Sequence, residues 1–216
     1  FLMRYERIDF AEAVQILAKK TGVVLEEKHS DSKDSLLIYY KINQMAADFY
    51  QRMLNSNIGN KAYQYLKKRG INENTQRLFK IGFAPEQPDS LTQYLRQNNF
   101  SVSILEKLGL VLSREGGGYY DRFRNRIIFP IFDIKSRILG FGARIIDSLA
   151  DKEQAKYINS PSSPIYTKGE HLYGLNFAKE EIIKMDSVVL VEGYFDFIIP
   201  FQAGLRNIVA SLGTAF

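Results

Sequence analysis

Residues 187–196 (SVVLVEGYFD) constrain the fold more than any other stretch of the sequence. The apolar residues 188–191 are mostly β-branched and run without polar alternation, which predicts a strand buried on both faces, as in a parallel sheet. Gly193 then lets the chain turn, and aromatic residues open a predicted helix that carries Asp196. Because ligands of open α/β sheets gather at the carboxyl ends of the strands, Glu192 occupies a position where such folds perform chemistry.

A second interpretation of Glu192 stays open at this point. Many buried strands end in a solvated glutamate followed by glycine, so the Glu-Gly pair alone does not identify a site. Asp196 adds weight, because a carboxylate four residues on can return to the same place from the first helical turn. The pattern is therefore compatible with paired catalytic carboxylates and with a solvated strand end.

The same residues resemble the first motif of the Toprim domain, the metal-dependent phosphoryl-transfer module of bacterial primases, topoisomerases and some nucleases. Other stretches resemble the bacterial replicative primases of the DnaG type, in one order along the chain: YLKKRGINENTQRLFKIGFAP at 65–85, YYDRFRNRIIFPIFD at 119–133, GFGAR at 140–144 and KYINSPSSPIYTKGEHLYGL at 156–175. AGLRNIVASLGTAF at 203–216 continues the pattern. These matches cover nearly the whole chain, so the sequence is identified as a member of this family.

The resemblance implies an α+β fold in three parts. Residues 1–36 would be the end of the segment after a zinc-binding module, plus a linker. Residues 37–184 would form the basic N-terminal subdomain of the primase core, with mixed helices and a β-hairpin. Residues 185–216 would be the first βαβ part of an α/β Toprim domain. Because the chain starts at Phe1 and such a domain should not end after one βαβ unit, we expect a fragment.

The composition of the sequence limits which partners and metals the protein is expected to bind. A net charge of +5 and an isoelectric point near 9.2 suit a polyanionic partner without proving one. The chain has no cysteine, and His29 and His171 are too few and too far apart for a metal site, so zinc is expected only in the upstream module that the family carries. With no apolar run of transmembrane length and no visible secretory signal, we expect a cytoplasmic protein without a membrane partner.

Periodicity and capping residues predict the local structure of the first half of the chain. Helices are expected over 9–20 (with Asp9 as cap), over 37–54, over 62–68, after the cap Asn72, after Ser90 and after Ser101, with a linker at 27–35 and a strand-like link at 82–85.

The second half is richer in strands. Residues 116–118 (GGG) predict a hairpin loop, and the runs 126–134 and 137–146 predict a β-hairpin in which Pro130 marks an edge or a bulge. Asn176 is expected to cap a helix that runs through Lys184. Pro200 fits a helix only if that helix begins near Asp196.

Arginines provide the candidate phosphate contacts. Arg122, Arg124 and Arg126 alternate, so on an extended strand they would share one face and present guanidinium groups suited to phosphate. A solvated strand face is the alternative. The resemblance adds Arg144 at the end of GFGAR and Arg69 in KKRG, although Arg69 is equally compatible with a structural role.

The resemblance also adds two lysines, Lys156 at the start of KYINSP and Lys168 in the TKGE turn. In the family these basic positions line a cleft that faces the Toprim site and bind nucleotide phosphates and the template backbone. Nearby, Tyr157, Tyr166 and Tyr173 are able to stack on unpaired bases, but core packing is the interpretation that we favour for each. In the NSP turn, the side chains of Asn159 and Ser160 are expected to hydrogen-bond the loop backbone.

The activity that the resemblance implies is DNA-directed synthesis of RNA primers at replication forks. Glu192 would be a metal ligand or a proton-transfer group, and Asp196 is a nearby carboxylate with a weaker claim. The cofactor would be Mg²⁺ or Mn²⁺, with the other ligands beyond Phe216, so the fragment should be inactive alone.

The implied partners are a single-stranded DNA template, NTPs and the RNA primer, with the replicative helicase bound through a C-terminal domain outside the chain. We expect a monomer. Two other functions are kept as alternatives. One is another Toprim enzyme, a topoisomerase or nuclease, and the other is a non-catalytic module that binds single-stranded DNA.

Overall fold

The computed structural model describes residues 10–22, 33–146 and 155–211. It divides into two units, Phe1–Lys33 and Asp34–Phe216. In the first unit, helix α2 (Phe10–Thr21) confirms the helix expected over 9–20, and it ends at Gly22, whose φ of +69° suits glycine. The predicted cap Asp9 and residues 27–32 of the predicted linker lie outside the described residues. Residues 33–35 are helical, so the linker prediction is wrong for them.

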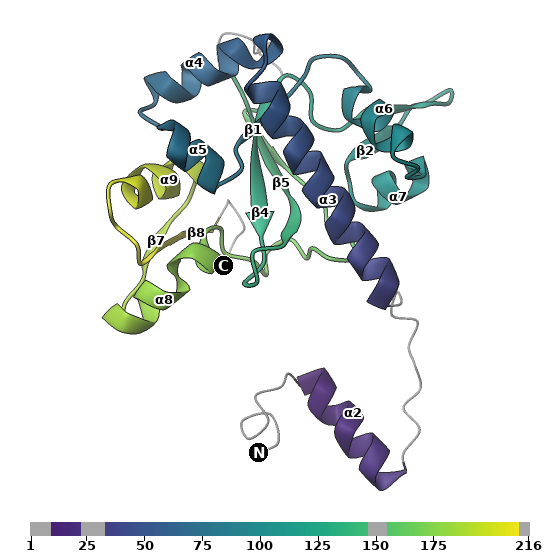
Figure 1. The fold of residues 1–216 in the computed structure, drawn as a ribbon, viewed down its shortest axis with the longest axis vertical. Helices are drawn as coiled ribbons and strands as arrows, with labels where there is room; N and C mark the ends of the chain where they lie inside the picture. The colour runs from purple at the N-terminus through teal and green to yellow at the C-terminus, as the bar shows by residue number, and fades with distance from the viewer. Residues whose placement is uncertain (1–9, 23–32, 147–154, 212–216) are drawn as a thin grey trace. The chain divides into compact units, whose positions relative to one another are not determined.

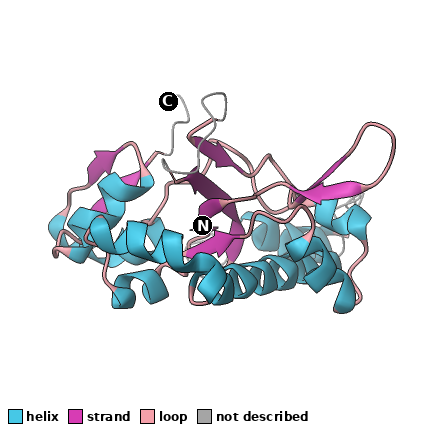
Figure 2. Ribbon diagram, turned by 90° about the horizontal axis from the view of Figure 1, so that it is seen from above, coloured by secondary structure: helices cyan, strands magenta, loops and turns pink. Residues whose placement is uncertain are grey.

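The second unit is built on a four-stranded antiparallel sheet and one long helix. The strand order is β1 (Gly82–Ala84), β4 (Arg126–Phe132), β5 (Ile138–Ile145) and β6 (Tyr157–Asn159), with β4 and β5 forming the predicted hairpin. Helix α3 (Lys33–Leu54) crosses one face of this sheet (Figures 1 and 2). Buried Asn43 fixes that crossing, because its Nδ2 donates to the carbonyls of Ile138 at 3.2 Å and Leu139 at 2.9 Å.

Pro130 lies in an interior strand of this sheet. Strand β1 pairs only with Arg126–Ile128 of β4, so at Pro130 the strand has β5 as its neighbour on one side alone. The register then shifts between Ile131 and Phe132. Both expected features, a local edge and a bulge, therefore occur around a residue that cannot donate a ladder hydrogen bond.

Four short helices follow α3 in the chain. They are α4 (Asn60–Lys68, after the 3₁₀ turn Asn57–Gly59), α5 (Glu73–Leu78), α6 (Ser90–Gln97) and α7 (Val102–Lys107). Two of them, α6 and α7, contact the β-hairpin that comes next in the chain. Asn72 caps α5 as predicted, since its Oδ1 accepts from the backbone N–H of Thr75 at 2.8 Å. The first turn of α6 is capped from a distance by Asp121, whose carboxylate accepts from the N–H groups of Leu91 at 2.7 Å and Thr92 at 3.0 Å.

The predicted glycine loop also forms. Strands β2 (Val111–Ser113) and β3 (Tyr119–Asp121) pair antiparallel on either side of it. Gly116, Gly117 and Gly118 all have positive φ, between 88° and 99°, which explains why the turn needs glycine.

The C-terminal part consists of α8 (Leu175–Met185), β7 (Val189–Val191), α9 (Tyr194–Gln202) and β8 (Ile208–Ala210). Strands β7 and β8 are parallel, as predicted. The expected burial of β7 on both faces is wrong: Leu190 is 53% exposed, whereas the residues of β8 are buried. Within the described part of the chain β8 is the only strand paired with β7, so one edge of β7 has no neighbouring strand.

Two further expectations about this part need correction. Helix α8 begins at Leu175 after Gly174, so Asn176 is not its cap, and its Nδ2 instead donates to Ser136 Oγ in the β4–β5 turn at 3.0 Å. Helix α9 begins at Tyr194, so Pro200 lies inside the helix and not in its first turn. Pro200 has no N–H for the carbonyl four residues earlier, a cost that the buried apolar face of α9 offsets.

Aromatic packing joins this part to the rest of the second unit. Phe79, at the end of α5, makes edge contacts with Phe197 at 5.4 Å and Phe201 at 5.3 Å between ring centroids. All three belong to the same buried cluster as the residues of the antiparallel sheet. Among the described residues, no helix is long and apolar enough to cross a membrane.

Candidate functional site

Glu192 lies at the carboxyl end of β7, where the sequence predicts a functional carboxylate, and its side chain is exposed. Asp196 is also exposed, but one of its oxygens is engaged. Its Oδ2 accepts from the backbone N–H of Gly193 at 3.1 Å and thereby closes the first turn of α9. The two carboxylates therefore lie on one turn, with Asp196 shaping the backbone that carries Glu192.

Tyr194 anchors this turn to the antiparallel sheet, a role that no motif of the sequence indicated. Its ring stacks on Phe129 at 4.6 Å with an angle of 11° between the planes, and its hydroxyl donates to Asn159 Oδ1 at 2.9 Å. Burial raises the pKa of Tyr194 well above its ordinary value, so the hydroxyl remains a donor at neutral pH. A Cβ built at Gly142 would overlap this hydroxyl, which explains glycine at that position of GFGAR.

Two arginines and three aromatic rings gather beside the same turn, and we name Arg69, Arg144, Tyr65, Tyr157 and Phe195 the arginine–aromatic cluster. Arg144 Nη1 donates to the Tyr157 hydroxyl at 2.9 Å. Its guanidinium carbon lies 5.3 Å from the ring centroids of Tyr65 and Tyr157 and 5.1 Å from that of Phe195. The guanidinium carbon of Arg69 lies 5.2 Å from Tyr65 and 5.3 Å from Phe195, so the two cations share two rings.

The cluster concentrates positive charge over the ring of Phe195, three residues after Glu192. Arg144 is only 3% exposed, so its charge is held in a poorly solvated position where the ring faces stabilise it. Burial raises the pKa of Tyr157, an effect that the neighbouring Arg144 partly opposes. The structure thus brings together predicted Arg69 and Arg144 with Tyr65 and Phe195, which the sequence did not single out.

The three alternating arginines do not share a face. Arg122 and Arg124 lie in the connection between β3 and β4, and only Arg126 belongs to a strand. Asn125, which lies between Arg124 and Arg126, has a φ of +53°, and this breaks the extended conformation that the prediction assumed. Arg124 is exposed and lies over the Tyr120 ring at 4.9 Å.

Arg126 is 6% exposed, and its Nη1 donates to the carbonyl of Lys156 at 3.4 Å. Burial lowers the pKa of Arg122 and of Arg126. Arg126 thus holds Lys156, the residue directly before the start of β6 at Tyr157. The ammonium-bearing residues Lys156 and Lys168 are both exposed, and the backbone N–H of Lys168 donates to Ser162 Oγ at 3.2 Å.

The three tyrosines of the 156–175 segment differ in how far they are buried. Tyr166 and Tyr173 are 5% and 1% exposed, which confirms core packing for both, whereas Tyr157 is 39% exposed. Ser160 Oγ accepts from a backbone N–H at 3.0 Å, but the donor is Phe141 in β5 and not the backbone of the NSP loop that was expected. Asn159 differs from the expectation, because its Oδ1 accepts from the Tyr194 hydroxyl.

A divalent metal would need more oxygen ligands than this turn offers. The Glu192 carboxylate is a suitable donor for Mg²⁺, but Asp196 is engaged with the backbone. Over the described ranges, no group of three or more His, Cys, Asp or Glu side chains is placed to hold a metal ion. The described residues do not make a complete metal site.

Comparison with known proteins decides the family. A sequence model of the DNA primase catalytic core, N-terminal domain, matches residues 49–179. The chain belongs to this family. It is 39% identical over 219 residues to the DNA primase of Clostridium acetobutylicum and 42% identical over 222 residues to that of Halalkalibacterium halodurans. Both matches include the whole chain, but they extend over only 35% and 36% of the two primases. The chain therefore spans about a third of the length of these relatives.

Solved primase structures confirm the α+β fold. The RNA polymerase domain of Mycobacterium tuberculosis primase DnaG matches 82% of the chain with a TM-score of 0.76 and 38% identity, over 57% of its own length. The zinc-binding and RNA polymerase domains of Aquifex aeolicus primase match the whole chain with the same score and identity, over 51% of that structure. A DnaG primase catalytic domain bound to single-stranded DNA matches 82% of the primase-core chain with a TM-score of 0.74 and 37% identity, over 56% of its length.

Proposed function

We propose that this primase-core chain is part of an enzyme that synthesises RNA primers on a single-stranded DNA template. The observation that carries the proposal is the arginine–aromatic cluster, which lies beside the turn that carries Glu192. The reaction joins the 3′-hydroxyl of a ribonucleotide to the α-phosphate of the next NTP and releases pyrophosphate. It requires positioned cations more than covalent catalysis by the protein.

Arg144 and Arg69 hold the incoming triphosphate or the template backbone in this proposal. A guanidinium fixed between ring faces loses little conformational freedom when it binds phosphate, so the cluster is preorganised. Lys156 and Lys168, both exposed, are proposed to add further positive charge for phosphate binding. The partly exposed ring of Tyr157 is available to stack on an unpaired base.

The exposed Glu192 carboxylate is proposed as one oxygen ligand of Mg²⁺ or Mn²⁺, or as the group that accepts the proton of the attacking hydroxyl. When bound, such an ion supplies charge neutralisation and activates the hydroxyl. Asp196 acts by shaping the turn, given its bond to Gly193. Among the described residues, no group of three or more His, Cys, Asp or Glu side chains surrounds Glu192 to complete such a site.

The organisation of the whole protein is proposed from the relatives. We assign 37–184 to the N-terminal subdomain of the core, 185–216 to the beginning of a Toprim domain and 1–36 to a connecting segment. Zinc would serve in a domain like that of the Aquifex aeolicus primase, since the 216 residues contain no cysteine. Replicative helicase, NTPs and RNA primer are the proposed partners, and a cytoplasmic location is proposed with them.

The test is primer synthesis by protein made from the complete reading frame, with single-stranded DNA, NTPs and Mg²⁺. We expect short RNA products that disappear in Glu192→Gln and persist in Glu180→Gln, a matched change at an exposed glutamate on α8. Nicking or relaxation of supercoiled DNA without RNA synthesis would assign the protein to another Toprim class. Tight single-strand binding with neither activity would favour the non-catalytic module.

A further inference from the structure

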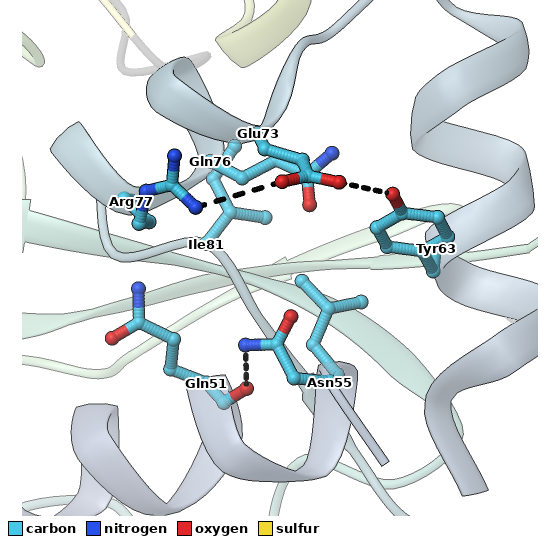
Figure 3. Close-up of a pocket in the computed structure, with 8 residues that line it drawn as sticks. Gln51, Asn55, Tyr63, Glu73, Gln76, Arg77 and Ile81 are labelled. Atoms are coloured by element: carbon cyan, nitrogen blue, oxygen red, sulfur yellow. Dashed lines mark hydrogen bonds and ion pairs between the residues drawn. The ribbon is translucent and has the colours of Figure 1, made fainter. Parts of the chain in front are cut away.

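A pocket of about 230 Å³ lies between the end of α3, helix α4 and helix α5, and none of its lining residues belongs to the arginine–aromatic cluster (Figure 3). Its floor is apolar, because Leu54 and Ile81 are 2% and 0% exposed. Its walls are formed by carboxamide, hydroxyl, carboxylate and guanidinium groups. An apolar base with a few converging polar groups is the usual composition of a small-molecule site.

Gln76 is the most informative of these wall residues. It is 5% exposed, and its Nε2 donates to the carbonyl of Ile71 at 3.0 Å, which fixes the orientation of the carboxamide. Within the described part of the chain, its carboxamide oxygen accepts no hydrogen bond. Gln76 lines the pocket, and its oxygen is not among the buried atoms that lack a partner, so a ligand that brings an N–H group into the pocket is able to donate to it.

The opposite wall offers a second carboxamide. Gln51 lines the pocket from α3, and its side chain makes no hydrogen bond within the described residues. Asn55 donates its Nδ2 to the carbonyl of Gln51 at 2.9 Å, which leaves its Oδ1 to accept (Figure 3). The carboxamides of Gln51 and Gln76 thus present both donors and acceptors from two different helices.

A charged set of side chains completes the rim. Glu73 accepts from the Tyr63 hydroxyl at 2.7 Å and lies 3.6 Å from Arg77 Nη1 (Figure 3). The pocket continues into an open groove that shares Gln51, Asn55 and Arg77 and adds Arg52 and Asp48. Positive charge from two guanidinium groups therefore lies next to the uncharged carboxamides.

We propose that this pocket binds a nucleotide, with the base between the Gln51 and Gln76 carboxamides. Carboxamides match the donor and acceptor edges of bases, a carboxylate such as Glu73 matches ribose hydroxyls, and guanidinium groups match phosphate. Arg77 and Arg52 would receive the phosphate in the adjoining groove. The site shares no lining residue with the arginine–aromatic cluster. Nucleotide binding there would be a property additional to primer synthesis.

The same chemistry would fit a free ribonucleotide or one nucleotide of a strand. The ligand that this site favours is the free ribonucleotide. The carboxylate at the rim favours a ligand with ribose hydroxyls. The small volume, about 230 Å³, suits one base. A strand would also need a run of cations along its path, whereas Arg77 and Arg52 share their surroundings with Glu73 and Asp48.

The experiment is a titration of the ¹⁵N-labelled 216-residue protein with AMP, GMP, CMP and UMP in the presence of EDTA. We expect saturable shifts of the side-chain NH₂ signals of Gln51, Asn55 and Gln76 for at least one nucleotide, with a Kd of about 0.1–1 mM. Gln51→Leu should raise that Kd at least tenfold. Gln87→Leu, the same change at an exposed glutamine elsewhere, should leave it unchanged.

Arg77→Gln separates the phosphate contact from the base contact, because it should weaken AMP binding and leave adenosine binding unchanged. Three results would overturn the proposal: no saturable shift up to 10 mM (about tenfold above the expected range), shifts confined to the signals of the arginine–aromatic cluster, or tighter binding of a short oligonucleotide than of any mononucleotide at these signals. Since no metal or template is present, the result is independent of primer synthesis.

Discussion

Replacement of Gly142 by alanine tests how the Glu192 turn is held against the sheet. Gly142 lies in β5 opposite Phe129 on one side and Asn159 on the other. A Cβ at this position would overlap the hydroxyl and the ζ-carbon of Tyr194. Either the Tyr194 ring or the strand must therefore shift.

The ring has little room to move. It is 2% exposed, stacked on Phe129 at 4.6 Å and met by the edge of Tyr173 at 4.9 Å, and its hydroxyl is bonded to Asn159. Inserting a methyl group into such packing costs about 1–3 kcal/mol. Loss of the hydroxyl's hydrogen bond adds about 1 kcal/mol. We expect Gly142→Ala to lower the free energy of unfolding by about 2–4 kcal/mol.

Urea unfolding followed by circular dichroism measures this loss, and a double-mutant cycle identifies its cause. Tyr194→Leu removes the overlapping atoms, so in that background Gly142→Ala should cost less than about 1 kcal/mol. Equal costs in the two backgrounds would refute the steric explanation. In the complete enzyme the same alanine should reduce primer synthesis on the order of 100-fold, because the turn that carries Glu192 is displaced.

Three other perturbations have definite expected results. Burial raises the pKa of Asp121 from 3.8 to about 6, so the folded state binds the proton more tightly than the unfolded chain. Stability should therefore fall by up to about 3 kcal/mol as the pH rises from about 4 to 6, a fall that is absent in Asp121→Asn when unfolding is measured across this range; parallel curves would contradict it. Asn72→Ala should lower the free energy of unfolding by about 1 kcal/mol, because the N–H of Thr75 loses its acceptor, and no measurable change in urea unfolding would argue against this cap. Arg144→Lys should weaken binding of single-stranded DNA or NTP nearly as much as Arg144→Ala, because lysine lacks the planar guanidinium that lies against the rings, and full retention of affinity in a binding titration would count against preorganisation.

Elements fixed by neighbours in the sequence could be predicted. The Asn72 cap, the glycine loop at 116–118 and the β4–β5 hairpin each depend on residues within a few positions of one another. The sequence contains that information directly, as turn and capping preferences. The family motifs likewise identified Arg69 and Arg144, which the structure brings together.

Features that depend on distant segments could not be predicted. Asp121 caps a helix 30 residues earlier, and Gly142 is required by a tyrosine on α9. The arginine alternation at 122–126 failed for a local reason, since Asn125 takes a left-handed conformation that a period-two pattern cannot reveal. The apolar run of β7 indicated a buried strand, but burial depends on which elements cover it and not on the run itself.

Two consecutive side chains explain how the carboxylate and the cations are placed relative to each other. Tyr194 packs against Phe129 and bonds to β6, while Phe195 lies under the guanidinium groups of Arg69 and Arg144. Only Gly193 separates them from Glu192 in the chain, so a shift of the first turn of α9 would move the carboxylate and the aromatic support of the cations together. Changes at Tyr194 should therefore affect phosphate binding as well as chemistry, although the tyrosine itself is buried beneath the site.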